Sequence, residues 1–431
     1  MDLLPLDHYF ADLHKNATED EHALLAAIMA SAREGHLCFD LRKWKNLKGV
    51  NSPYLCREGD LIYLKRNFEC EKEIVQHLKR LISSVQSPPY STEGFTDEQA
   101  QAVHMALSNT LSIIEGGPGT GKTHLTSALV KAIGKGVVLT APTGKAAARL
   151  KKYNPEVHCS TLHALLGFPT RRKTSYIGAN FILIDESSMM DARLLVHFLR
   201  SLRLGQRVVF LGDGHQLPPI ESGSLFTDLI DIIPTAHLTR CLRSDRREIL
   251  QLAQDVLTGK TVTPHEPLSK ESLWRAKGKA ILTPLREGPW GVRAVNEIIF
   301  SSIKMPEDQI WSVPIIVTKT DYEIELYNGE VGTLWRTNVK PLYAEFDGRR
   351  VSASQLPSYE LAFALSVHKS QGSEFDHVVV LVPPGSENFG REMLYTAVTR
   401  ARDSVILCGD VETIQKTVNH SIQKISGIKS V

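Results

Sequence analysis

The chain has 431 residues, of which 42% are hydrophobic and 23% are charged, with a formal net charge of +2. This length and composition predict a soluble globular protein of two to four domains with a sizeable core. The near-neutral charge gives no overall attraction to nucleic acid, so it leaves the choice of partners open.

Cysteine usage and hydropathy indicate a cytoplasmic protein with no membrane contact. The six cysteines contain no C-x-x-C pair, which argues against a disulfide framework and against a zinc ribbon. No apolar run approaches the 18 residues needed to cross a bilayer. The first segment carries acids where a signal peptide has a basic start, so neither secretion nor membrane insertion is expected.

Residues 1–86 are predicted to form a mostly helical amino-terminal domain. Apolar residues recur at helical spacing in 21–32 and in 73–85, and 60–65 reads as a short strand between them. The proline- and serine-rich stretch 83–94 then predicts a linker.

Beyond the linker, short β-branched runs alternate with helical stretches. This alternation predicts an α/β fold of parallel sheets covered by helices. The runs lie at residues 111–115, 137–141, 181–185 and 207–211, and then at 313–318, 377–382 and 404–409. We expect one domain over 92–238 and a second over 239–431, because the later strands need a second sheet. Within the second domain, Asn-Gly and Asp-Gly turns predict a small inserted antiparallel barrel at about 321–360.

The strongest motif is a G-x-x-x-x-G-K-T pattern between a predicted strand and a predicted helix. Its members are Gly116, Gly117, Pro118, Gly119, Thr120, Gly121, Lys122 and Thr123. Such a loop binds the phosphates of ATP through backbone N–H groups, with Lys122 on the β and γ phosphates and the Thr123 hydroxyl on Mg²⁺. A glycine-rich turn without function is the alternative.

A carboxylate pair follows the predicted strand at 181–185. Asp185 is placed to hold Mg²⁺, and Glu186 to orient and deprotonate the attacking water. The alternative is a helix N-cap, which the upstream phosphate loop makes less favourable.

Polar residues elsewhere suggest a motor rather than a simple kinase. Gln216 follows another buried strand and would sense the γ phosphate, unless it is only an exposed loop residue. Arginines at 238–245 and 395–402 would stabilise transition-state charge from a second domain, unless they are merely solvated. The cluster LSVHKSQGSEFDH at 365–377 is open to four readings: a metal site, a nucleophile with its base, a phosphate loop or a polar turn.

Taken in order, these motifs resemble a known family. They are TDEQ at 96–99, GGPGTGKTH at 116–124, APTGKAAARL at 141–150, STLHALLG at 160–167, LIDESSMMD at 183–191, LGDGHQLPPI at 211–220, LRS at 242–244, YNGEVG at 327–332, ALSVHKSQGSEFDH at 364–377 and LYTAVTRAR at 394–402. Residues 92–410 resemble superfamily-one helicases of the RecD type, the α subunit of exodeoxyribonuclease V. The resemblance implies two tandem RecA-like domains, a small SH3-like β insertion and an amino-terminal domain that docks on a partner.

The resemblance also implies residue roles. Gln99 reads adenine, Gln216 couples hydrolysis to movement, Arg243 and Arg400 contact the γ phosphate, and Glu374 contacts the ribose. The single-stranded DNA contacts fall on Thr143, Thr161, His163, Ser366, His368 and Lys369. The cluster at 365–377 is then an interdomain loop that touches DNA and nucleotide. Its contacts with phosphate and sugar would position a strand without reading its sequence.

The expected function is therefore an ATP-dependent 5′ to 3′ helicase or translocase on single-stranded DNA, with ATP and Mg²⁺ as cofactors and RecB-like and RecC-like subunits as partners. Alternatives are a stand-alone RecD-like helicase and a regulatory subunit whose motor has decayed. Ser244, Ser366 and Thr320 depart mildly from the family pattern. Only about thirty residues separate 141–150 from 181–185, so the strand-separating pin of some relatives shrinks to a short turn at 168–180.

Overall fold

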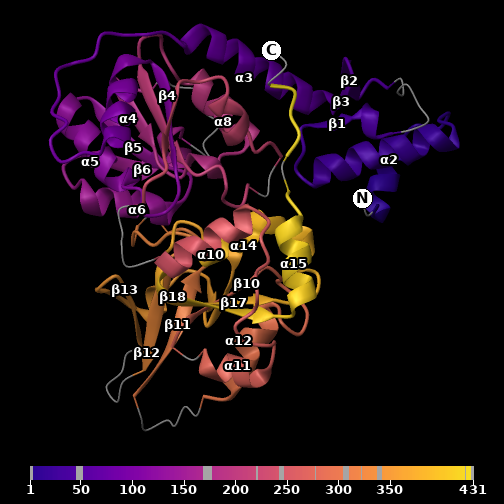
Figure 1. The fold of residues 1–431 in the computed structure, drawn as a ribbon, viewed down its shortest axis with the longest axis vertical. Coiled ribbons are helices and arrows are strands. Elements are labelled where there is room, and N and C mark those ends of the chain that lie inside the picture. Colours follow the sequence, from indigo (N-terminus) through magenta and orange to yellow (C-terminus); the bar gives the residue numbers. More distant parts are fainter. Residues whose placement is uncertain are drawn as a thin grey trace.

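The protein forms three units arranged around two parallel sheets (Figure 1). The computed structural model describes residues 3–44, 52–167, 177–219, 222–241, 247–276, 278–303, 310–321, 323–336, 342–422 and 424–428. Within this part of the chain, no helix is both long and apolar enough to cross a bilayer.

The amino-terminal unit packs helices on a three-stranded antiparallel sheet of order β1-β3-β2, which confirms its predicted helical character. Its elements are α1 (Pro5–Asp12), α2 (Glu19–Arg33), β1 (Cys38–Asp40), η1 (Leu41–Lys43), β2 (Leu55–Glu58), β3 (Leu61–Leu64) and α3 (Lys65–Leu81). Helix α2 begins at a capping box, in which Thr18 accepts from the Glu21 amide and Glu21 accepts from the Thr18 amide. Figure 1 shows α2 projecting from the body, with α3 lying across its upper side.

The first parallel sheet has the order β6-β5-β7-β8-β4-β9, and all four strands predicted here are confirmed. Its strands are β4 (Leu111–Gly116), β5 (Val137–Ala141), β6 (His158–Thr161), β7 (Phe181–Ile184), β8 (Arg207–Gly212) and β9 (Thr235–Leu238). Its helices are α4 (Asp97–Ser108), α5 (Lys122–Ile133), α6 (Gly144–Tyr153), α7 (Leu162–Leu165), α8 (Ala192–Arg200) and α9 (Phe226–Ile230), with a 3₁₀ turn η2 (Ser187–Met189). Strand β7 is apolar throughout, and every residue of β8 after Arg207 is buried, because helices cover both faces of the sheet.

The second parallel sheet has the order β16-β10-β17-β18, and the predicted strands at 377–382 and 404–409 are confirmed within it. Its strands are β10 (Ala280–Thr283), β16 (Ala364–Ser366), β17 (Phe375–Val382) and β18 (Ala401–Gly409). Its helices are α10 (Arg247–Leu257), α11 (Lys270–Arg275), α12 (Val292–Ser301), α13 (Val367–Ser370), α14 (Gly390–Val398) and α15 (Val411–Asn419), with a 3₁₀ turn η5 (Ser386–Phe389). Two RecA-like α/β units therefore stand in tandem, as the sequence predicts.

An antiparallel sheet of order β14-β13-β12-β11-β15 is inserted in the second unit. It comprises β11 (Trp311–Val317), β12 (Val331–Arg336), β13 (Tyr343–Phe346), β14 (Arg349–Ser352), η4 (Ala353–Gln355) and β15 (Tyr359–Leu361). The expectation that the run 313–318 joins the parallel sheet is wrong. Strand β11 pairs with antiparallel neighbours on both sides, so it is as buried and as rich in β-branched residues as a parallel strand.

Residues 420–422 and 424–428 return from the second unit to the other two, along the yellow segment that climbs from α15 toward α3 (Figure 1). Ile428 is 1% exposed and belongs to the core of the first parallel sheet. The Gly427 amide donates to Glu71 of α3 at 3.0 Å, and the Ser426 hydroxyl donates to Asp228 of α9 at 2.6 Å. We call residues 420–422 and 424–428 the C-terminal strap.

Candidate nucleotide and DNA site

The predicted phosphate loop connects β4 to α5 and has the backbone that its glycines allow. Gly119 and Gly121 have φ of 79° and 91°, in the left-handed region that favours glycine. A Cβ on Gly116 would lie 2.7 Å from Oγ1 of Thr120 and 2.9 Å from Cβ of Leu238. The loop therefore curls tightly ahead of the amino terminus of α5, the arrangement that binds phosphate.

Lys122 and Gln99 both contact the backbone of this loop. The Lys122 ammonium donates to the carbonyl oxygens of Gly116 and Gly117, the second at 3.0 Å. Gln99 is buried, and its Nε2 donates to the carbonyl of Thr120 at 3.2 Å. Gln99 also forms a capping box with Thr96 at the start of α4. The structure thus brings Gln99 to the phosphate loop, with its amide engaged by protein atoms.

A cavity of about 630 Å³ opens beside the loop and is lined from both RecA-like units. This volume falls in the range of ordinary ligand sites. The first unit contributes Glu115, Gly116, Gly117, Pro118, Thr120, Asp213, His215, His237 and Leu238. The second unit contributes Arg247, Leu250, Gln251, Ala253, Gln254, Leu257, Tyr395 and Thr399, and the segment between them contributes Thr239 and Cys241.

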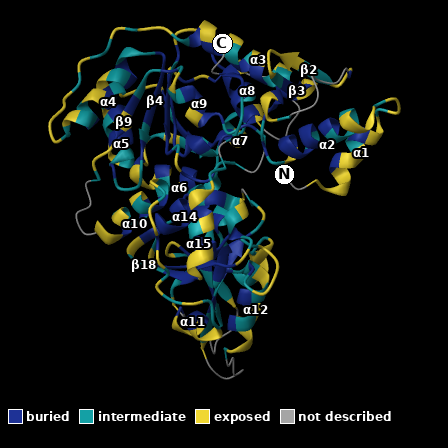
Figure 2. Cartoon of the chain, turned by 45° about the vertical axis from the view of Figure 1, so that its right-hand side comes forward, coloured by how far each residue is buried: buried dark blue, intermediate teal, exposed yellow. Residues whose placement is uncertain are grey.

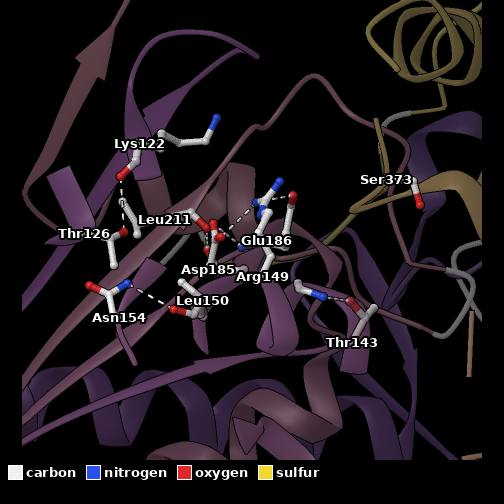
Figure 3. A network of polar contacts seen from close by, with 12 residues as sticks. Lys122, Thr126, Thr143, Arg149, Leu150, Asn154, Asp185, Glu186, Leu211 and Ser373 are labelled. Atoms are coloured by element: carbon white, nitrogen blue, oxygen red, sulfur yellow. Dashed lines mark hydrogen bonds and ion pairs between the residues drawn. The ribbon is translucent and has the colours of Figure 1, made fainter. Parts of the chain in front are cut away.

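The two acids Asp185 and Glu186 follow β7 at the same edge of the sheet as the phosphate loop, and both are less than 10% exposed. Nη2 of Arg149 lies 3.0 Å from Oδ2 of Asp185 and 3.4 Å from Oε1 of Glu186. Figure 3 shows the guanidinium of Arg149 between the two carboxylates. Burial acts to lower the pKa of Arg149, but the two carboxylates outweigh burial and raise it above its usual value.

Gln216 lies in a network that joins the two units. Its Nε2 donates to Oδ2 of Asp213 at 3.2 Å, and the Tyr395 hydroxyl of α14 donates to the same oxygen at 2.9 Å. The next residue, Leu217, donates its amide to Thr396 at 2.7 Å and accepts from Gln371 at 2.7 Å. The loop after β8 is therefore bonded to α14 and to the cluster at 365–377.

The structure describes one of the two arginines expected at the γ phosphate, Arg400, and the residue expected at the ribose, Glu374. Arg400 is buried, and its guanidinium donates to the carbonyls of Thr396 at 3.2 Å and Ser373 at 3.3 Å. Glu374 pairs with Arg402 at 3.1 Å. Neither Arg400 nor Glu374 lines the cavity. Arg243 lies outside the described residues, as does most of the short turn at 168–180.

Three of the six residues expected to contact DNA are helix N-caps. Thr143, Thr161 and Ser366 accept from the amides of Ala146, Ala164 and Lys369, at 3.3, 3.1 and 3.3 Å. The hydroxyl groups of these three residues therefore stabilise helix amino termini, in addition to any contact with DNA. Figure 3 shows Thr143 at the start of α6, away from the acids.

The other three expected DNA contacts differ in their surroundings. The Lys369 ammonium pairs with Glu360 at 3.0 Å. Burial, with a smaller effect of Lys424, lowers the pKa of His368 to about 4, so its ring is neutral at pH 7. His163 is exposed and lines a second cavity of about 550 Å³ together with α3 and α8.

Several residues at this site were not predicted from the sequence. Arg149, Asp213 and Tyr395 each lie inside a quoted motif but received no role. The carboxylate of Glu115, at the end of β4, lies 2.7 Å from Nδ1 of His237 at the cavity wall. The positions of Asp213 and Glu115 at the carboxyl ends of buried strands are the signal that would have found them.

Family models match both RecA-like units. Residues 94–272 match the AAA domain, and residues 361–408 match the UvrD-like helicase C-terminal domain. Together the two matches cover the phosphate loop, the acids, the cluster at 365–377 and α14.

Curated relatives cover most of the chain. The ATP-dependent RecD2 DNA helicase of Deinococcus radiodurans is 30% identical over 400 residues, which are 82% of this chain and 56% of that protein. The RecBCD enzyme subunit RecD of Mycolicibacterium smegmatis is 29% identical over 461 residues, with 88% of this chain and 83% of that one covered. The chain thus spans little more than half of the first relative and most of the second.

A solved structure shares the fold at low sequence identity. The Pif1 helicase of Candida albicans aligns with a TM-score of 0.52 and 20% identity, and the alignment covers 74% of this chain and 95% of that one.

Proposed function

The chain belongs to the RecD-type superfamily-one helicases, and from that premise we propose that it is an ATP-driven motor that moves along single-stranded DNA. The proposal rests above all on the composition of the nucleotide cavity. Gly117 and Pro118 line it from the first RecA-like unit, and Tyr395 and Thr399 line it from the second. A nucleotide bound there would touch both units, so its hydrolysis would change how the units sit against one another.

Residues at this cavity match the needs of phosphoryl transfer to water. Lys122 would exchange the carbonyls of Gly116 and Gly117 for the β and γ phosphates. Glu186 would orient the attacking water and accept its proton, and Gln216 would sense the γ phosphate. Arg243 and Arg400 would stabilise charge on the transferred group once the units close.

The acids also fit a magnesium ion. Asp185 and Thr123 would hold it, and the ion pairs of Arg149 with Asp185 and Glu186 support a cation at these acids. When bound, the ion supplies neutralisation of the β and γ phosphates. The donor set of carboxylate and hydroxyl oxygens is the one that Mg²⁺ prefers.

The DNA track is proposed to run over Thr143, Thr161, His163, Ser366, His368 and Lys369. Thr143 begins α6, and Gly372 in the cluster at 365–377 approaches its hydroxyl, since a Cβ there would lie 3.7 Å away. Contacts with phosphate and sugar from both units would let the strand pass between them without sequence preference. The 5′ to 3′ direction follows from the family alone.

An exposed apolar surface on the amino-terminal unit favours the subunit role over a stand-alone helicase. Five large apolar side chains on and beside α1 are each more than a third exposed: Leu3, Leu4, Leu6, Tyr9 and Leu13. Figure 2 shows exposed residues along α1, which projects from the body. Apolar area of this kind marks a protein interface. We assign it to a RecC-like subunit in a complex that also holds a RecB-like subunit, in the cytoplasm.

The ATPase rate of the purified chain, with and without a single-stranded oligonucleotide, tests the motor. We expect strong stimulation that weakens as salt rises, because phosphate contacts release counterions. A rate that stays flat for the chain and for its co-expressed complex would reject the motor. Loss of co-purification on changing Leu6 and Tyr9 to serine, with ATPase retained, would separate docking from catalysis.

A further inference from the structure

Arg149 contacts the hydrolytic acids in a way that the proposed mechanism does not use. Its Nη2 bonds both Oδ2 of Asp185 and Oε1 of Glu186, and the other oxygen of Asp185 accepts the Glu186 amide at 2.9 Å. Both oxygens of Asp185 are therefore engaged. Nε of Arg149 is buried and has no hydrogen-bond partner among the described residues, so the guanidinium is not satisfied by this arrangement.

The backbone of Glu186 is also held in an unusual conformation. Its φ of 53° and ψ of 36° lie in the left-handed region, which a non-glycine residue adopts at an energetic cost. The bond from its amide to Asp185 and the bond from Arg149 hold it there. Oε1 of Glu186 is freed to orient a water when it leaves Arg149.

Charge makes Arg149 a competitor of the metal. The guanidinium brings positive charge to the same carboxylates that would hold a divalent cation, and two cations close to each other repel. Arg149 in this position therefore opposes binding of the metal by Asp185 and engages the oxygen of Glu186 that faces it.

Helix α6 connects Arg149 to the junction of the two RecA-like units. Its N-cap is Thr143, and Arg149 lies six residues later, about 9 Å along the axis. In its first turn, Nζ of Lys145 donates to Oγ of Ser373 at 2.6 Å. A Cβ on Gly144 would lie 2.3 Å from Cβ of Tyr327, so the inserted region touches the helix backbone closely.

Because α6 is one rigid element, a shift of its first turn carries Arg149 with it. The second unit contacts this turn through Ser373, and the inserted region contacts it through Tyr327. A strand laid over Thr143 would press on the same turn. The helix therefore links the place where DNA is expected to the acids that hydrolyse ATP.

We propose that Arg149 is an inhibitory contact that restrains Asp185 and Glu186 in the DNA-free protein and that DNA at the first turn of α6 releases them. The proposal rests on the motor function given above, and it makes Arg149 a positioning residue through which DNA stimulates hydrolysis.

The test compares Arg149→Met and Arg149→Lys with the unchanged chain, and takes Lys151→Met as a control that removes an exposed charge from the same helix. We expect Arg149→Met to raise the DNA-free ATPase rate about tenfold and to shrink the stimulation by DNA correspondingly, since one hydrogen-bonded charge contact is lost. Arg149→Lys keeps the charge and should fall between. A fall in rate by the same factor with and without DNA would overturn the proposal.

A measurement without turnover separates this proposal from the motor itself. Mn²⁺ binding to the chain with bound ADP, followed by the paramagnetic resonance of free Mn²⁺, should tighten about tenfold in Arg149→Met. Unchanged or weaker Mn²⁺ binding contradicts the inhibitory contact. If the unchanged chain hydrolyses no ATP with or without DNA, the motor fails, while the Mn²⁺ comparison still decides the role of Arg149.

A second variant covers the case in which Arg149→Met does not fold. Lys145→Met cuts the bond to Ser373 but leaves Arg149 on the acids. We expect it to lower the DNA-stimulated rate severalfold, the opposite of the rise expected for Arg149→Met. Full DNA stimulation in Lys145→Met would contradict a link that runs through α6.

Discussion

The hydroxyl of Tyr395 donates a hydrogen bond of 2.9 Å to Oδ2 of Asp213, and so joins α14 of the second RecA-like unit to the loop after β8 of the first. Gln216 donates to the same oxygen at 3.2 Å. A Cβ on Gly117 of the phosphate loop would lie 3.2 Å from the Tyr395 hydroxyl. The Tyr395 hydroxyl thus lies beside the phosphate loop and shares one oxygen of Asp213 with the residue expected to sense the γ phosphate.

Replacing Tyr395 with phenylalanine removes this hydroxyl and keeps the ring. Asp213 then retains only Gln216 as a side-chain partner among the described residues. We expect a loss of about 2 kcal/mol in unfolding free energy, the scale of a hydrogen bond to a charged group, and a severalfold lower ATPase rate. Urea unfolding and ATPase assays measure the two effects. Tyr359→Phe, at an exposed position of β15, is the control and should change neither.

Lys122→Gln tests the phosphate loop directly. Its ammonium contacts only the carbonyls of Gly116 and Gly117 in the described structure, so the change should leave folding intact. We expect turnover to fall by about 10³ or more, because the charge on the β and γ phosphates loses its partner. Lys131→Gln, on the exposed side of the same helix α5, is the matched control. Near-normal hydrolysis in Lys122→Gln would remove the basis for a motor.

The sequence predicts the parts of this site that depend on local geometry. A phosphate loop needs its glycines, lysine and threonine in one strand-to-helix turn, and the acids need only the end of a strand, so both are visible in short stretches. The domain boundaries expected at residues 86, 92, 238 and 239 stay predictions.

Contacts between distant segments were not predictable. Arg149 meets Asp185 and Glu186 across more than thirty residues, and in the sequence it resembles any solvated arginine on an amphipathic helix. Gln99 fits a helix capping box with Thr96 as well as an adenine contact. The sequence alone does not distinguish these two roles, because a glutamine at this position suits both. Strand β11 was misplaced because a buried β-branched run fits either kind of sheet.

The C-terminal strap is expected to stabilise the whole chain. Ile428 is 1% exposed in the core of the first parallel sheet, so Ile428→Ala should cost about 2–4 kcal/mol of unfolding free energy. Gly427→Ala should destabilise too, because its Cβ would lie 2.0 Å from the Tyr63 hydroxyl. Urea unfolding gives both values. Val411→Ala, at the exposed start of α15, is the control, and equal midpoints in all three variants would show that the strap does not hold the units together.

Two buried histidines predict how stability depends on pH. Burial, then the charges of Lys424 and Lys43, lower the pKa of His36 to about 4, and burial, then Lys424, lower that of His368 to about 4. Nδ1 of His36 accepts the amide of Ile425 in the strap at 2.9 Å, which requires an unprotonated nitrogen. Both rings are therefore neutral in the folded chain at pH 7.

The direction of the pH dependence follows from proton uptake by the unfolded chain. Between pH 6.5 and about pH 4 the unfolded chain binds protons at both histidines while the folded chain does not, so stability falls as pH falls through this window. Each histidine contributes up to about 3 kcal/mol of this loss. In His36→Asn with His368→Gln, the unfolding free energy should fall less between pH 7 and pH 4.5 than in the unchanged chain. His104→Gln, on an exposed ring, is the control, and parallel pH profiles for the double variant and the unchanged chain would show that these two rings are not the buried neutral groups.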